Sequence, residues 1–254
     1  MKISAVIITL NEEKNIGRCL ESLKGVADEV VVVDSLSADN TEAICKKYDV
    51  RFVSQKFLGY VEQKNFAANC AKYDFVLNID ADELLSKELQ ESIIKLKSSS
   101  NPKTAYSFNR LNNYYGKWIK HSGLYPDRKL RLYDRTKGRF EGKYVHEKVV
   151  MQEGYKDVEQ LKGDLLHYAY DSKDSLIRQL DKFSSLRAKE YAEKGKKVST
   201  AKIILKTCWK FLRDYFILLG FLDGKRGFEL CKIYAKYEHD KYAKTKSLLE
   251  QSKS

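Results

Sequence analysis

The chain has 254 residues, 43% of them hydrophobic, which is enough to bury a sizeable core as one domain or as a main domain with an appendage. Its formal net charge of +12 comes mainly from residues 171–254, where 20 Lys and Arg face 11 Asp and Glu, and this asymmetry indicates a polyanionic partner, either nucleic acid or an anionic membrane surface. The five cysteines lack paired spacings and therefore predict neither a disulfide framework nor a zinc site.

Apolar runs and helical patterns alternate from the first residues onward. Strands are predicted at 3–9, 30–33, 51–53 and 75–79, with helices near 16–23, 37–47 and 60–72. This alternation is typical of a parallel sheet built from βαβ units. The opening run is too short and too strand-like for a signal peptide and lacks a cleavage site, so we expect a cytoplasmic chain.

Polar residues follow three of these strands. They are Thr9, Asn11 and Glu12 after the first, Asp34 and Ser35 after the second, and Asp80 and Asp82 after the fourth. Because parallel strands end at one edge of a sheet, we expect these groups to gather at one crevice that binds a ligand. Asp34 suits hydrogen bonds from a ribose or a base, although capping the following helix explains it equally well.

The sequence Asn-Ile-Asp-Ala-Asp-Glu at residues 78–83 closes the fourth apolar run. On extended backbone, Asp80 and Asp82 leave from the same face and can converge. Two such carboxylates suit a hard divalent cation, which in turn neutralises a diphosphate. The tripeptide alone fits a solvated turn as well, and its position at a strand end is what favours a metal site.

Glycine-rich phosphate motifs are absent from the sequence. No Gly-x-Gly-x-x-Gly follows the first strand, and no Gly-x-x-x-x-Gly-Lys-Ser/Thr occurs. A dinucleotide fingerprint and an NTPase phosphate loop are therefore both excluded, and a nucleotide would be held by side chains and a metal.

Four segments, in their order and spacing, resemble the successive motifs of family 2 GT-A glycosyltransferases, most closely the bacterial branch that includes lipopolysaccharide core β-1,4-glucosyltransferases. They are residues 9–12, 33–41, 63–65 and 78–83, and the resemblance covers about the first 170 residues. It implies a Rossmann-like α/β fold with a mixed, mostly parallel sheet flanked by helices. It also implies a nucleotide-diphosphate sugar donor, a divalent metal (Mn²⁺ or Mg²⁺) and inversion at the anomeric carbon.

The resemblance also implies roles for individual residues. Thr9, Asn11 and Glu12 edge the nucleoside pocket, Asp34 contacts the base or ribose, and Ser35, Gln63 and Lys64 border the donor. Asp80 lies near the ribose and metal, and Asp82 is the direct metal ligand. Lys64 either offers its charge to the donor phosphates or lies on a helix surface.

The second half of this region carries the remaining candidates. Arg128 or Arg131 can reach a phosphate as a bidentate fork, and we favour Arg131. Displacement at an anomeric carbon needs a base for the acceptor proton, and the resemblance assigns that role to Glu147. Many family members have Glu-Asp where this chain has His146-Glu147, so His146 either shares the role or is structural. By the same resemblance, His167 completes the metal or diphosphate site.

An aromatic segment, residues 114–125, lies between these candidates. It contains Tyr114, Tyr115, Trp118 and Tyr125. Such rings stack on the apolar face of a pyranose in sugar-binding loops, but packing in the core explains Trp118 equally well.

The C-terminal third is predicted to be helical and basic. Within residues 200–222, Lys202, Lys206, Lys210 and Arg213 recur at steps of four, four and three among large apolar residues. This pattern predicts a helix in a membrane interface, or alternatively one packed on the catalytic core. We expect a break at 223–227, a second helix over 228–242 and a frayed polar end. The longest uncharged run is too short to span a bilayer.

Together these patterns predict a catalytic domain over residues 1–170 and a basic amphipathic helical region over 171–254 that contacts membrane or acceptor. The expected activity is inverting, metal-dependent transfer of a hexose, with glucose and UDP favoured, to a lipid-linked glycan such as lipopolysaccharide core. Capsule or exopolysaccharide, polyprenyl phosphate and peptide acceptors are the alternatives, and the enzyme is expected on the inner face of the membrane. A sugar-nucleotide binder without catalysis and a nucleic-acid-binding protein are remoter hypotheses, and we expect no nucleic-acid partner.

Overall fold

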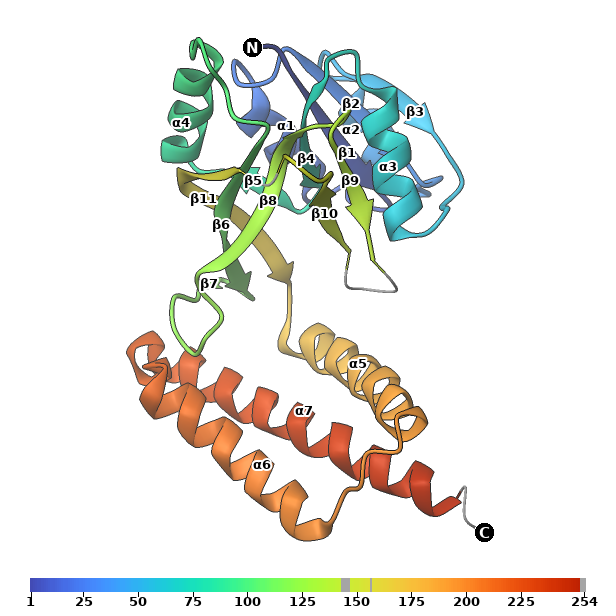
Figure 1. The fold of residues 1–254 in the computed structure, drawn as a ribbon, viewed down its shortest axis with the longest axis vertical. Coiled ribbons are helices and arrows are strands. Elements are labelled where there is room, and N and C mark those ends of the chain that lie inside the picture. The colour runs from blue at the N-terminus through green and yellow to red at the C-terminus, as the bar shows by residue number, and fades with distance from the viewer. Residues whose placement is uncertain (143–146, 156, 252–254) are drawn as a thin grey trace. The chain divides into compact units, whose positions relative to one another are not determined.

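The computed structural model describes residues 1–142, 147–155 and 157–251. The chain divides into two compact units (Figure 1). The first comprises Met1–Leu111 and Asp127–His167, and the second comprises Asn112–Pro126 and Tyr168–Ser254. The segment 112–126 lies within the first predicted domain in sequence but groups with the C-terminal helices in space.

A mixed sheet, which has nine strands in the described part of the chain, organises the first unit. Its order is β3 (Arg51–Ser54), β2 (Glu29–Asp34), β1 (Ile3–Thr9), β4 (Phe75–Asp80), β8 (Asp127–Asp134), β6 (Ala105–Tyr114), β11 (Val158–Tyr170) and β5 (Glu83–Leu85), with β7 (Lys117–Trp118) paired to β6. The first four strands are parallel, and β8 pairs antiparallel with both β4 and β6. A separate hairpin joins β9 (Gly138–Glu141) to β10 (Lys148–Met151). The expected α/β class with a helix-flanked mixed sheet is confirmed.

Both faces of the parallel part of the sheet are buried. Ile3, Ala5 and Ile7 of β1 share a core with apolar residues of α1 (Ile16–Leu23) and α4 (Lys87–Lys97). Val6 points to the other face and packs with the α3 helix (Tyr60–Cys70). Burial on two faces explains why β1 reads as a continuous apolar run, and each fully buried aliphatic side chain contributes about 1.5–3 kcal/mol.

The register of β1 aligns the ends of three strands. Thr9 pairs with Asp34 of β2, and Ile8 pairs with Asp80 of β4. The prediction that the polar strand ends meet at one edge of the sheet is therefore confirmed. The helix α2 (Thr41–Cys45) follows this edge and lies within the predicted range 37–47.

The second unit contains α5 (Lys173–Glu193), α6 (Thr200–Leu212), a π-helical turn η1 (Arg213–Ile217), a 3₁₀ turn η2 (Gly220–Asp223) and α7 (Gly224–Gln251). Both α5 and α6 pack along α7 (Figure 1). A cluster around Tyr114, Ile119, Leu176 and Leu230 forms the core. None of the helices in the described residues is long and apolar enough to cross a bilayer.

Two expectations for the C-terminal region were wrong. The chain breaks at residues 218–223, where Leu219 has φ 56°, and α7 already begins at Gly224. Gly227 lies inside the helix, and only glycine fits there, because a Cβ would lie 2.0 Å from the Gly220 carbonyl oxygen. The end of α7 is not frayed before Gln251, because Thr245 is fully buried.

We predict that Gly163→Ala destabilises the first unit strongly. Gly163 on β11 has φ +90°, and an added Cβ would lie 2.2 Å from the Leu89 backbone nitrogen. Backbone strain and overpacking together should lower the free energy of unfolding by about 3 kcal/mol or more, measured by urea denaturation. Gly25→Ala is the matched control, because Gly25 has φ +74° with open space around it, and it should cost only about 1 kcal/mol. Equal losses would contradict the proposed close packing.

Candidate active site

The edge where β1, β2 and β4 end is built from two interlocked loops. Asn11 adopts a left-handed conformation with φ 55°, and its side-chain oxygen accepts a hydrogen bond from the Ala38 N–H at 2.8 Å. In return, the Asn11 N–H donates to Ser37 Oγ at 2.8 Å. The Glu12 N–H likewise donates to Thr41 Oγ1 at 2.8 Å. The loops after β1 and β2 therefore hold each other in place.

Asp34 fixes the second of these loops. Its carboxylate accepts a hydrogen bond from the Ser37 N–H at 2.8 Å and a second one from the Ser37 hydroxyl. At the first turn of α2 it is Asp39 that accepts a hydrogen bond, from the Thr41 N–H at 3.0 Å. Asp34 is therefore not the cap of that helix.

The α3 helix delivers two buried polar side chains toward the same edge. Gln63 is fully buried, and its side-chain amide donates to Ser35 Oγ at 3.2 Å. Lys64 is only 2% exposed, which excludes the helix-surface alternative. Nearby, Thr9 Oγ1 is buried and has no hydrogen-bond partner among the described residues. A buried hydroxyl without a partner marks a place where a ligand group can bind.

Asp80 is the centre of a network of buried charges. Lys64 Nζ lies 3.0 Å from its Oδ1, and an Arg131 guanidinium nitrogen lies 2.9 Å from its Oδ2. Burial would raise the pKa of the Asp80 carboxyl, but attraction to Lys64 and Arg131 outweighs burial and holds that pKa well below its usual value. Asp80 is therefore ionised throughout the physiological range.

Arg131 is occupied by protein carboxylates. Besides Asp80, its guanidinium contacts Glu83 at 3.1 Å and the Asn78 side-chain oxygen at 3.3 Å. Burial lowers the pKa of Arg131, yet the charges of Glu83 and Asp80 raise it overall. The contact of Arg131 with a phosphate stays a prediction, and Arg128 is exposed.

Two members of this network were missed in the sequence. Glu83 is fully buried and also contacts Arg110, 3.4 Å away, and Arg110 in turn binds Asp127 at 2.8 Å. The available signal was position: Glu83 directly follows the acidic motif, and Arg110 interrupts an apolar strand. Neither signal identifies the partner, because the contacting residues are far apart in sequence.

Asp82 has a different environment from Asp80. It lies in the turn between β4 and β5, and its Oδ2 is 3.2 Å from His167 Nε2. The antiparallel pairing of β11 with β5 sets His167 opposite Glu83 and thereby brings its imidazole to Asp82. The two residues that the sequence assigned to one metal site are therefore in contact.

Asp82 and His167 fit a divalent cation that takes few of its ligands from the protein. Within the described parts of the chain, no group of three or more His, Cys, Asp or Glu side chains is placed to hold a metal ion. Asp82 and His167 would provide two ligands, and Mg²⁺ commonly takes its other positions from substrate phosphates and water. Both Asp80 oxygens contact the cations Lys64 and Arg131, and the role of Asp80 beside the metal stays a prediction.

Glu147, immediately before β10, shares Lys64 with Asp80. Its Oε1 lies 3.3 Å from Lys64 Nζ, whereas its Oε2 is buried without a hydrogen-bond partner among the described residues. A buried carboxylate oxygen without a donor is costly, so this oxygen is suited to receive a hydroxyl group. His146, the neighbouring candidate, lies outside the described residues.

The aromatic segment packs within the second unit. Tyr114 is buried, stacks on Tyr170 with centroids 5.3 Å apart, and shares a hydrogen bond of 2.8 Å with the Tyr234 hydroxyl. Trp118 meets Tyr168 edge-on at 5.2 Å. These contacts favour the core-packing alternative for both rings.

Replacing Lys64 by Met should destabilise the protein by about 3–5 kcal/mol, because Glu147 then loses its cation and Asp80 is left with Arg131. The measurement is the free energy of unfolding at neutral pH. Lys95→Met is the control, since Lys95 is exposed on α4 and should change stability by no more than about 0.5 kcal/mol. If both variants were equally stable, the buried ion pairs would have no net stabilising effect.

The chain is similar to known proteins over most of its length. Residues 4–156 match the model of Glycosyl transferase family 2. An uncharacterized glycosyltransferase of Rickettsia typhi is 35% identical over 264 residues, covering 100% of this chain and 89% of the relative. The lipopolysaccharide core biosynthesis glycosyltransferase LpsC of Rhizobium meliloti is 34% identical over 240 residues, covering 89% and 88%. Among solved structures, S. aureus TarS 1–349 in complex with UDP aligns with a TM-score of 0.47 and 17% identity, covering 100% of this chain and 91% of that chain. The family match over more than half of the chain, together with the Rickettsia and Rhizobium relatives, shows that the chain belongs to glycosyl transferase family 2 and is a glycosyltransferase.

Proposed function

We propose that this glycosyltransferase is an inverting, metal-dependent enzyme that moves a hexose, with glucose favoured, from a UDP-sugar to a lipid-linked glycan such as lipopolysaccharide core. The observation that carries the proposal is the asymmetric contact of Glu147. One of its oxygens is held by Lys64, and the other is buried without a partner within the described residues. This is the arrangement that a general base needs: one oxygen fixes the orientation and the other accepts the proton.

On the donor side, the loops after β1 and β2 form the nucleoside site. Thr9, Asn11 and Asp34 line it, and Gln63 supports Ser35 from α3. When bound at Asp82 and His167, Mn²⁺ or Mg²⁺ would stabilise the charge that develops on the leaving diphosphate. Asp80, fixed by Lys64 and Arg131, holds the end of β4 in place.

On the acceptor side, Glu147 performs the proton chemistry. As the acceptor hydroxyl oxygen bonds to the anomeric carbon, its proton passes to Glu147 Oε2, and the bond from that carbon to the diphosphate oxygen breaks. Attack from the face opposite the leaving group inverts the configuration. Lys64 holds Glu147 Oε1 during this step, so the carboxylate enters it already oriented.

The acceptor class rests on similarity to LpsC, whose name places that relative in lipopolysaccharide core biosynthesis. We propose a lipid-linked glycan for this chain as well, with the enzyme bound peripherally to the inner face of the membrane. The basic excess of residues 171–254 supports that location. Capsular or exopolysaccharide, polyprenyl phosphate and peptide acceptors are the alternatives that an acceptor screen would distinguish.

Asp82→Ala should lower the turnover of UDP-glucose by about 100-fold or more, since a metal supplies several kcal/mol of charge stabilisation. The measurement is release of UDP in the presence of Mn²⁺ or Mg²⁺, and chelation of wild type should reproduce the loss. The control is Asp157→Ala, which removes an exposed carboxylate that pairs with Lys103. Full activity of the Asp82 variant would disprove its metal role.

Glu147→Gln should reduce kcat for sugar transfer by roughly 10²–10⁴, the usual contribution of a general base, without changing the affinity for UDP. UDP affinity is measured by calorimetry, and turnover by UDP release. Glu141→Gln provides the comparison, because Glu141 is an exposed carboxylate on β9 directly opposite Lys148. Nearly unchanged turnover in the Glu147→Gln variant would assign the base to another residue.

A further inference from the structure

Large apolar side chains are exposed along α6 and the two turns that follow it. We name six of them the α6–η2 face: Leu205, Trp209, Leu212, Phe216, Ile217 and Leu222. Leu205 is 69% exposed and Ile217 is 61% exposed. Exposed apolar surfaces of this kind are rare on soluble monomers and mark a surface that binds something else.

Four members of the α6–η2 face lie along one side of α6 and η1. Leu205, Trp209, Leu212 and Phe216 follow each other at steps of four, three and four and therefore form one stripe. On the opposite side, Ile203 is buried where α6 packs along α7. The second unit therefore does not use the stripe for its own packing.

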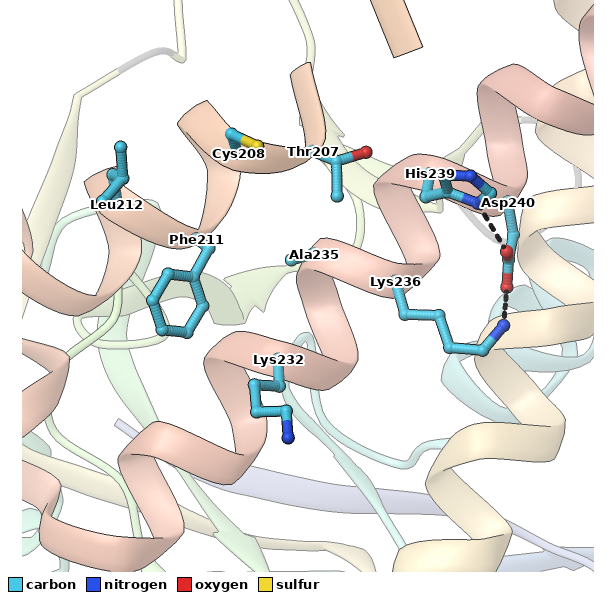
Figure 2. A pocket seen from close by; sticks show the side chains of 9 residues that line it. All are labelled: Thr207, Cys208, Phe211, Leu212, Lys232, Ala235, Lys236, His239 and Asp240. Atoms are coloured by element: carbon cyan, nitrogen blue, oxygen red, sulfur yellow. Dashed lines mark hydrogen bonds and ion pairs between the residues drawn. The ribbon is translucent and has the colours of Figure 1, made fainter. Parts of the chain in front are cut away.

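An open groove extends this apolar surface toward α7. It has a volume of about 700 Å³, and Cys208, Phe211, Leu212 and Ala235 provide its apolar lining. Figure 2 shows Cys208, Phe211 and Leu212 on α6 and Ala235 on α7, together with Lys232 and with Lys236 paired to Asp240. Leu212 belongs to both the groove and the α6–η2 face, so the two surfaces are continuous.

Lysines border the apolar surface on both sides. Lys202 and Lys206 precede Leu205 and Trp209 by three residues on the same helix, while Lys232 stands across the groove. In the part of the chain that the structure describes, neither Lys206 nor Lys232 pairs with a carboxylate. Their charges are therefore available to an external anion.

Only part of the positive charge of the basic stripe predicted from the sequence is available to an external anion. Lys210 and Arg213 both contact the buried Asp214, at 2.6 and 2.7 Å, so its single negative charge offsets one of their two positive charges. Lys202 and Lys206, which flank the apolar stripe, are both exposed.

We propose that the α6–η2 face lies in the headgroup region of an anionic lipid bilayer, with its apolar side chains at the acyl boundary and Lys206 and Lys232 on the lipid headgroups. The charge pattern favours this occupant over a second copy of the chain, which would bring like-charged lysines together around one interface. An indole at Trp209 is suited to the same boundary. The inference deepens the proposed action on a lipid-linked acceptor, but bilayer binding requires no catalysis.

The test is sedimentation of the full chain with vesicles of phosphatidylglycerol and phosphatidylcholine, compared with pure phosphatidylcholine, at physiological salt and without a sugar donor. Wild type should bind the anionic vesicles, and Leu205→Ser with Trp209→Ser should lower the partition coefficient about tenfold or more. Lys206→Ala should lower it roughly fivefold. Quenching of Trp fluorescence by brominated lipid, lost in Trp209→Phe, would place that ring in the bilayer.

The matched control is Ile177→Ser with Leu186→Ser, which removes two exposed apolar side chains from α5 of the same unit and should leave binding unchanged. Circular dichroism verifies that all variants are folded. The proposal is overturned if wild type ignores anionic vesicles, if the Leu205/Trp209 variant binds like the control, or if the face instead mediates self-association or oligonucleotide binding. UDP release measured separately shows whether the proposed catalysis fails independently.

Discussion

The contact between Asp80, Lys64 and Arg131 is the interaction on which the first unit depends most. It joins the end of β4 to the α3 helix and to β8, and through Lys64 it reaches Glu147 before β10. Charges removed from water are tolerated only when they are paired with good geometry, so the four segments must assemble together. The position of the proposed base is thereby linked to the packing of the sheet.

Sequence reasoning found the sheet edge but not this contact. The strands and their polar ends follow from apolar runs and from the rule that parallel strands end together, and both signals are local. Lys64 and Asp80 are 16 residues apart, and Arg131 and Asp80 are 51 apart. No periodicity encodes such distances, and for that reason the role of Lys64 stayed open and Arg131 was assigned to a phosphate.

In the C-terminal helices, tertiary packing overrides a local sequence signal for a helix break. Two glycines and an aspartate after residue 222 are ordinary helix breakers. Here α7 begins at Gly224 and includes Gly227. Close approach to Gly220 allows no side chain at position 227, so only glycine fits there. The same packing covers one side of α6, and the pattern alone did not show that Asp214 would pair with Lys210 and Arg213.

For the two aspartates of the acidic motif, the rule that alternate side chains share a face holds only as far as the strand extends. Alternation predicts that Asp80 and Asp82 share a face, but β4 ends at Asp80 and a turn carries Asp82. Asp80 consequently contacts the two cations Lys64 and Arg131, while Asp82 contacts an imidazole, and the two side chains are similarly exposed, at 26% and 27%. A carboxylate held by Lys and Arg is a poor ligand for a further cation, and one beside a histidine is a good ligand. The structure thus gives the two carboxylates different partners, and the proposed metal role of Asp82 rests on this difference.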